Sequence, residues 1–260
     1  MRKSYLLIAL ILLLVGVVSS AGVWKIPSST AEAHMMLPVA GGGATGGGGG
    51  GDYSDNFDDN DITDWSQESG TWIASGGVLQ PPDSAAGIII APDSTTGNDQ
   101  YAAMKQAGNA TTNSYDGIAF NVNASGVGYA VRWQRAGGTF LFRKLTAWTT
   151  GNGDIGSTVS DGALTVGDSW GVRSSTISTV KVVRLYLWDS QSPPAWGTWA
   201  DGACVKAWCN GTCPAGVVCD SEEDVSGDSD WALLTGTDVG VYSGSTAASY
   251  WDDFTYGDDD

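Results

Sequence analysis

The sequence has a single histidine, only four glutamates and only 12 lysines and arginines among 260 residues. Against these 12 bases stand 29 acidic residues, so the formal charge is −17, which excludes a nucleic-acid-binding surface because such a surface needs an excess of Lys and Arg. Nearly all of the acid is aspartate, and there are 37 glycines. Since both residues are poor helix formers that favour turns, a mostly α-helical fold is disfavoured.

Long apolar runs are also absent, apart from one at the N-terminus over residues 5–18. This run is shorter than the ~20 residues that a membrane-spanning helix needs. Arg2 and Lys3 precede it and small residues up to Ala21 follow, which is typical of a secretory signal peptide over residues 1–21. The alternative is an uncleaved anchor that attaches the chain to a membrane or surface. Either way, we expect the rest of the chain to be secreted or exposed at the cell surface.

Residues 22–51 precede the part of the chain that is rich in apolar residues. Within them, residues 41–51 are all glycine except Ala44 and Thr45, and His34 lies just before. Such a tract has no side chains to bury and behaves as a flexible linker. No Gly-Lys-Ser/Thr follows it, so it is not a phosphate-binding loop. The predicted organisation is a stalk over residues 22–51 and one globular domain over residues 52–260.

From residue 52 onward, short alternating or apolar runs are broken by Gly, Asn, Asp and Pro. No window sustains a helical period, and 12 tryptophans supply apolar mass for a core. The pattern predicts an all-β jelly-roll sandwich of two antiparallel sheets. The strands are expected over residues 72–80 (a hairpin), 87–91, 100–106, 117–122, 128–134, 139–145, 163–166, 170–173, 180–188, 238–242 and 250–256.

Several short motifs occur in an order that carries a family resemblance. They are Asp55-Asn56-Phe57, Trp65, Gly70, Trp72, Gly77-Val78-Leu79, Asp116-Gly117-Ile118-Ala119-Phe120, Gly128-Tyr129-Ala130-Val131, Leu164-Thr165-Val166-Gly167-Asp168-Ser169-Trp170, Val239-Gly240-Val241-Tyr242 and Asp252-Asp253-Phe254. In this order they resemble a concanavalin A-like lectin/glucanase domain of the laminin G-like sort, over residues 52–257. The resemblance implies that the first and last strands lie side by side.

The four cysteines, Cys204, Cys209, Cys213 and Cys219, all fall within a Cys-rich insert at about residues 190–230. Their even number and close spacing in an exported chain favour two local disulfides, with three possible pairings. A four-thiolate zinc site would prefer two pairs with two residues between the cysteines of each pair, which is not the spacing here.

Aspartates near both ends of the domain are candidates for a shared cation site. Asp55 and Asp58 lie near the first strand, and Asp252 and Asp253 lie in the last. Calcium takes six to eight oxygen ligands and suits clustered carboxylates, and the resemblance to lectin-like sandwiches adds an expectation of structural calcium. The alternative is a solvated acidic rim without specific geometry.

Tryptophans in turn-rich segments predict a carbohydrate-binding surface. The C–H faces of sugar rings stack on indole, while nearby Asp and Asn side chains accept hydrogen bonds from sugar hydroxyls. The candidates are Trp148, Trp196, Trp199, Trp208 and Asp201. The alternative is that these rings belong to the core, because aromatic residues alternate into the core of any sandwich.

An enzyme is the less favoured class. Glucanases of the resembling fold carry a Glu-x-Asp-x-Glu segment, whereas the only paired glutamates here, Glu222 and Glu223, are adjacent and would point to opposite faces of a strand. The leading hypothesis is therefore an exported, lectin-like domain that binds a glycan or polysaccharide. The alternative is a self-assembling structural or adhesive subunit of a surface layer, filament or virion, and a glycoside hydrolase or lyase ranks third.

Overall fold

The computed structural model of the chain describes residues 53–82, 86–108, 115–150, 153–160, 164–231, 235–244 and 249–259. All of the described residues belong to one compact unit, Ala40–Asp260. The signal peptide or anchor over residues 1–21 and the stalk over residues 22–51 lie outside the described residues and stay predictions. No helix in the described part is long and apolar enough to cross a membrane.

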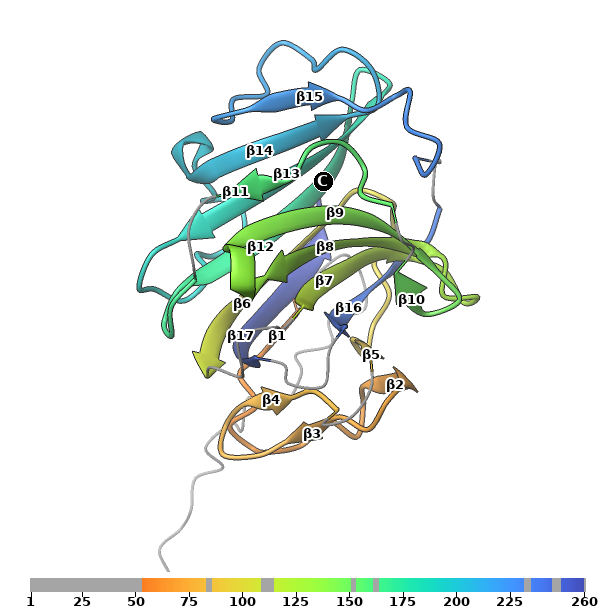
Figure 1. The fold of residues 1–260 in the computed structure, drawn as a ribbon. Helices are drawn as coiled ribbons and strands as arrows, with labels where there is room; N and C mark the ends of the chain where they lie inside the picture. The colour runs from red at the N-terminus through yellow and green to blue at the C-terminus, as the bar shows by residue number, and fades with distance from the viewer. Residues whose placement is uncertain are drawn as a thin grey trace, which may run out of the picture. The chain divides into compact units, whose positions relative to one another are not determined.

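The described residues form two curled sheets, and all but one of the strand pairings are antiparallel (Figure 1). Sheet A contains β1 (Tyr53–Asp55), β3 (Ile73–Ala74), β4 (Leu79–Gln80), β6 (Gln100–Gly108), β12 (Ser169–Ile177), β13 (Val180–Trp188), β14 (Cys204–Cys209), β15 (Glu222–Asp224) and β17 (Tyr250–Asp258). Sheet B contains β2 (Ser66–Ser69), β5 (Gly87–Ile90), β7 (Tyr115–Val122), β8 (Gly128–Gln134), β9 (Thr139–Thr146), β10 (Thr149–Thr150), β11 (Val159–Ser160) and β16 (Asp238–Ser243). Two single turns of 3-10 helix, η1 (Arg135–Gly137) and η2 (Asp201–Ala203), complete the described secondary structure. The predicted all-β jelly-roll sandwich is confirmed.

The last strand, β17, lies beside the first strand, β1, in sheet A (Figure 1). The two are antiparallel, with Tyr53 opposite Tyr256 and Asp55 opposite Phe254. On its other side β17 pairs with β6. The adjacency of the first and last strands, which the family resemblance implied, is confirmed.

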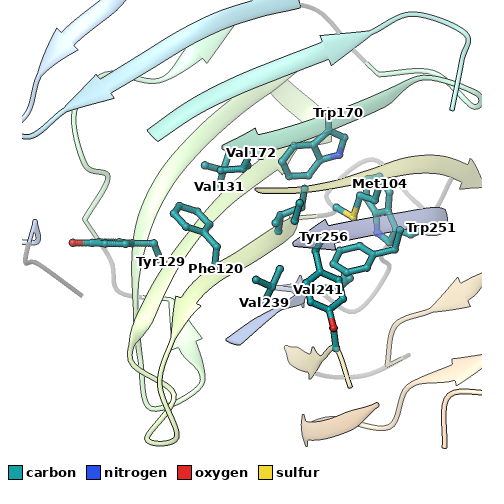
Figure 2. Close-up of a cluster of buried hydrophobic side chains, with 14 of the residues drawn as sticks. Met104, Phe120, Tyr129, Val131, Trp170, Val172, Val239, Val241, Trp251 and Tyr256 are labelled. Carbon is teal, nitrogen blue, oxygen red and sulfur yellow. The ribbon is translucent and has the colours of Figure 1, made fainter. Parts of the chain in front are cut away.

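The main core lies between the two sheets and is rich in aromatic rings (Figure 2). Sheet B contributes Phe140 and Phe142, whose ring centroids lie 5.3 Å from Trp170 and 5.2 Å from Trp208 of sheet A. Phe140 and Phe142 both point into the core because successive side chains of a strand point to opposite faces, so residues two apart share a face.

The outer faces of both sheets are buried as well. On sheet A, an outer aromatic cluster covers the face that points away from the core; its members are Tyr101, Tyr186, Trp188, Trp196 and Trp199. On sheet B, a smaller apolar group includes Ile88, Ile90, Leu145 and Tyr242. Because both faces of the central strands are covered, β13 is an almost continuous apolar run rather than a clean alternation.

The Cys-rich insert is partly sheet, which the sequence analysis did not predict. Its disulfides join Cys204 to Cys219 and Cys209 to Cys213, so the expectation of two local disulfides is confirmed. The segment from Cys204 to Cys209 forms β14, antiparallel to β13, and β15, which follows the last cysteine, is parallel to β14. The insert therefore extends sheet A.

The strand expected at residues 163–166 is wrong over the described residues 164–166. The amide of Asp168 donates to the carbonyl of Thr165 at 3.0 Å, which makes this segment a turn that leads into β12. The order Val-Gly-Asp in a short apolar segment suits such a turn.

Gly240 in β16 provides a test of how tightly sheet B is packed. A Cβ atom at this position would lie 2.1 Å from the carbonyl oxygen of Ile89, whereas one at Gly202 would meet nothing within 4 Å. We expect Gly240→Ala to lower the free energy of unfolding by about 1–3 kcal/mol, because the neighbouring backbone must move, and Gly202→Ala to change it by less than about 0.5 kcal/mol. Urea denaturation of both variants measures the difference, and equal midpoints would contradict the predicted packing.

Candidate functional site

A pocket of about 470 Å³ lies on sheet A where β1 and β17 meet the loop that follows β13. We call it the Trp196 pocket. Its wall combines hydroxyl, amide and carboxylate side chains with one indole and two prolines; it is lined by Ser54, Asp55, Asn56, Ser192, Pro193, Pro194, Ala195, Trp196, Asp253 and Thr255. Residues from the two sets that the sequence analysis treated separately, the tryptophans and the terminal aspartates, thus share one wall.

The indole of Trp196 is held in a fixed orientation by the outer face of sheet A. It stacks on Tyr101 with ring centroids 4.0 Å apart and an interplanar angle of 4°. The guanidinium of Arg173 lies 5.0 Å from the centroid of the same indole, and this arginine forms an ion pair with Asp259 at 2.6 Å. Burial alone would lower the pKa of Arg173, but the Asp259 carboxylate outweighs it and the pKa is raised. Trp196 therefore rests on a charged and aromatic base that limits its motion.

The loop that carries Trp196 is tied down on both sides. Trp199 inserts into the outer aromatic cluster, and its indole N–H donates to the carbonyl of Pro194 at 3.0 Å. Before the loop, the amide of Ser190 donates to the carboxylate of Asp168 at 2.8 Å. These contacts fix the two ends of the segment, so the pocket wall is preorganised rather than assembled on binding.

The polar side of the pocket comes from an irregularity in β17. The pairing of β17 with β6 shifts register between Asp252 and Thr255, and Asp253 has a positive φ of 48°. This backbone turns the Asp253 carboxylate towards the loop, where it accepts hydrogen bonds from the hydroxyl of Ser192 and from the ammonium of Lys105, the latter at 3.2 Å. The carboxylate is thus held in place by groups from two other segments.

Asp55 faces the same pocket but is engaged in the fold. Its two carboxylate oxygens accept hydrogen bonds from the amide of Phe57 at 2.8 Å and the indole N–H of Trp65 at 2.9 Å. Burial raises the pKa of Asp55 above its ordinary value, and the nearby Asp59 and Asp64 add to the rise. This aspartate therefore secures the segment after β1.

The predicted cation site at Asp55, Asp58, Asp252 and Asp253 is not formed by the described residues. No group of three or more His, Cys, Asp or Glu side chains among them is placed to hold a metal ion. The physical reason is that these carboxylates are used locally: Asp58 accepts from the side-chain Nδ2 of Asn56 at 2.8 Å, and Asp252 accepts from the backbone N–H of Asp253 at 2.7 Å.

The tryptophans predicted to bind sugar lie in different environments. Trp196 lines the pocket, and Trp148 is half-buried at the β9–β10 turn, against the outer face of sheet B. The expectation that Trp208 is exposed is wrong: it is 0% exposed, because β14 brings it between the sheets. Trp199 is only 8% exposed and packs in the outer aromatic cluster, where it anchors the loop and offers little surface to a ligand. Asp201 is exposed at the start of η2 and does not line the pocket.

Several residues of the site were missed by the sequence analysis. Tyr101 and Arg173 come from β6 and β12, where they lie opposite each other in the register. Lys105 approaches Asp253 across a large separation in sequence. These positions depend on strand pairing, and no local motif marks them. The hydroxyls of Ser54 and Thr255 could have been noticed, because they flank the D-x-F segments.

No family model matches the sequence, and no curated protein matches it. Solved structures do resemble it. A protein of unknown function with a galectin-like fold from Bacillus subtilis has a TM-score of 0.50 at 9% identity, covering 79% of this chain and 94% of that one. A carbohydrate-binding module from Bacillus subtilis has a TM-score of 0.43 at 12% identity, covering 76% and 94%. The exoplasmic/lumenal domain of VIP36, bound to Ca²⁺ and Man3GlcNAc, has a TM-score of 0.45 at 14% identity, covering 78% and 87%.

The chain has a concanavalin A-like fold of the galectin-like kind. The first of these likenesses, together with the paired curled sheets and the adjacent first and last strands, decides it. The resemblance found in the order of sequence motifs is confirmed at the level of the fold.

The carboxylate of Asp168 makes the stability of the fold at the pocket loop depend on pH. It is largely buried, and although burial alone would raise its pKa, hydrogen bonds from the amides of Thr165 and Ser190 and from the hydroxyl of Thr165 lower it. Because the folded pKa lies below the unfolded one, the ionised carboxylate stabilises the fold above the ordinary pKa near 3.8, and this stability is lost as the pH falls through the lowered value.

We therefore expect Asp168→Asn to cost about 1.5–3 kcal/mol at pH 7, and this cost to shrink as the pH falls below about 4. Urea unfolding of both proteins at pH 7, 4 and 2.5 measures it. A cost that is independent of pH would show that the charge of Asp168 does not hold the loop.

Proposed function

We propose that the chain is an exported, non-enzymatic glycan-binding domain and that a sugar ring binds on Trp196 in the Trp196 pocket. The observation that carries this proposal is the pocket itself, in which one rigidly held indole stands beside hydroxyl, amide and carboxylate side chains. A pocket of about 470 Å³ falls within the range of small-molecule sites.

The chemistry of the wall suits a carbohydrate. A sugar ring offers an apolar face of C–H groups and an edge of hydroxyls, and it needs both a flat apolar surface and polar partners at the side. Trp196 supplies the first, while Asn56 and Thr255 supply the second. Because Tyr101 already fixes the indole, stacking costs little side-chain entropy.

Binding is favoured over hydrolysis by how the two carboxylates are used. A glycosidase needs one carboxyl group to donate a proton and a second to act as nucleophile or base. Here both oxygens of Asp55 accept internal hydrogen bonds, and Asp253 is paired with Lys105 and Ser192. Both carboxylates therefore position the pocket wall and the loop, which supports a role in recognition.

Replacing the indole tests this proposal. We expect Trp196→Ala to weaken binding of an oligosaccharide at least tenfold, about 1.4 kcal/mol or more, because the stacking surface is lost. The matched control is Tyr250→Ala, which removes an aromatic residue that is 41% exposed and does not line the pocket. A glycan array on the intact chain selects the ligand, and isothermal titration with and without calcium measures the affinity of each protein.

The outcomes separate the alternatives. A flat response to every glycan would contradict the proposal, and concentration-dependent assembly of the same sample would favour a structural subunit. Loss of binding in Trp148→Ala but not in Trp196→Ala would move the site to the outer face of sheet B. Release of reducing sugar that is abolished by Asp253→Asn would favour a hydrolase.

Export and tethering belong to the same proposal. The two disulfides support an oxidising compartment, and the sequence predicts removal of residues 1–21 and a flexible stalk. When the full chain is produced in a host with a secretory pathway, we expect mass spectrometry to find Gly22 at the N-terminus of the exported protein. Retention of Met1 would favour the uncleaved anchor, and accumulation in the cytoplasm would contradict export.

A further inference from the structure

Arg132 is a buried cation on the face of sheet B that points away from the core. Its neighbours in β8, Val131 and Trp133, belong to the main core. Because successive side chains of a strand point to opposite faces, Arg132 lies on the other face, beside Tyr115 and Tyr242. The guanidinium carbon lies 5.1 Å from the centroid of Tyr115 and 5.6 Å from that of Tyr242. The residue is only 6% exposed.

The hydrogen bonding of this guanidinium is incomplete. One terminal nitrogen donates to the hydroxyl of Thr150 at 2.7 Å, and the buried Nε has no partner among the described residues. Arginine carries five N–H donors. The two tyrosine rings compensate part of the charge through cation–π contacts, and the hydroxyl of Tyr242 favours the charged form of the guanidinium.

The charge of Arg132 also lacks an ion-pair partner in the described part of the chain. The acid that acts on Arg132, Asp154, forms its ion pair with Arg143 instead, at 2.5 Å. Burial lowers the pKa of Arg132 and the positive charge of Arg143 lowers it further, whereas Tyr242 and Asp154 oppose this shift only in part. Buried charges in proteins are normally paired, whereas Arg132 forms no ion pair with the described residues and is offset only at longer range by Asp154.

A second buried arginine gives a useful comparison. Arg184 on sheet A is 5% exposed, donates to the hydroxyl of Ser175 at 2.7 Å and also has an unpartnered Nε. Its surroundings differ in degree, because two carboxylates, those of Asp259 and Asp201, act on it, whereas only that of Asp154 acts on Arg132. Incomplete hydrogen bonding is therefore shared by the two arginines, but Arg184 has two nearby acids and Arg132 has one, which is already paired with Arg143.

We propose that Arg132 anchors a second binding site, separate from the Trp196 pocket, for a carboxylate group carried by a ligand. A planar guanidinium matches a carboxylate through paired hydrogen bonds. Around it, the hydroxyls of Thr150 and Tyr115 and the amide of Gln134 are polar groups that suit the remainder of a small polar ligand. The carboxylate can belong to an acidic sugar or to a free organic acid, and the two sources are distinguished below.

The experiment measures thermal unfolding of the full chain with glucuronate, acetate or glucose, at constant ionic strength set with sodium chloride. We expect a saturable rise in Tm of about 3–6 °C at about 20 mM glucuronate, the size of effect that a millimolar site produces. No rise is expected with glucose. A rise with acetate as well as glucuronate identifies the carboxylate alone as the ligand, and a rise with glucuronate only identifies an acidic sugar.

The variants assign the effect to Arg132. Arg132→Met, of similar length and without charge, should abolish the response, while Arg184→Met should keep it. Trp196→Ala should also keep it, which separates failure of this site from failure of the Trp196 pocket. No carboxylate-dependent rise in the wild-type chain, or the same rise in Arg132→Met, would overturn the proposal.

The wild-type chain supplies an independent readout if Arg132→Met does not fold. Crystals soaked in glucuronate should show the sugar carboxylate within hydrogen-bond distance of the Arg132 guanidinium. Bound glucuronate elsewhere on the molecule, with the Arg132 site empty, would overturn the proposal.

Discussion

The packing of the closing strand β17 is the constraint on which the candidate site depends. Trp251, Phe254 and Tyr256 all belong to the main core. With a strict alternation of faces, Trp251 would point away from the other two, because the spacing between residues 251 and 254 is odd. A register shift between Asp252 and Thr255 resolves the conflict, and the positive φ of Asp253 marks where the extra residue is absorbed. The carboxylate of Asp253 faces the pocket as a consequence of burying three aromatic rings.

A third layer on sheet A then determines how rigid the pocket is. In a two-layer sandwich, the outer face of β6, β12 and β13 would be exposed to solvent, and a loop that crosses it would be held by few contacts. Here Trp199 packs against Tyr186 and Trp188, with ring centroids 5.1 Å and 4.8 Å away, so the loop is anchored by its own aromatic residue. Trp196, three residues earlier, therefore presents a surface that is already ordered.

The same third layer explains what could and could not be predicted from the sequence. The strands at residues 128–134 and 180–188 were predicted with their exact bounds, since turn residues flank clear apolar runs. Burial of Trp199 was not predictable, because a covered outer face leaves no period in the sequence. Trp208 was misjudged for a related reason: its strand, β14, lies in a Cys-rich segment that looks like loop, and only its pairing with β13 places the indole in the core.

The electrostatics of the two proposed sites follow from local rather than net charge. At physiological ionic strength, interactions between exposed charges fall off over about 8 Å, so a formal charge of −17 does not determine what each surface can bind. The Trp196 pocket lies on sheet A among aspartates, with Lys105 as the base paired to Asp253. Arg132 and Arg143 lie on sheet B, where Asp154 forms an ion pair with Arg143 and acts on Arg132 only at longer range.

The separation of these surfaces limits how they can act together. Packed sheets are about 10 Å apart, and the aromatic core fills the space between them. A short oligosaccharide on Trp196 therefore cannot also reach Arg132. Occupation of both sites requires either two ligands or a polymer long enough to pass around the edge of the sandwich, and in the second case the gain in avidity depends on the length of the polymer between its bound residues.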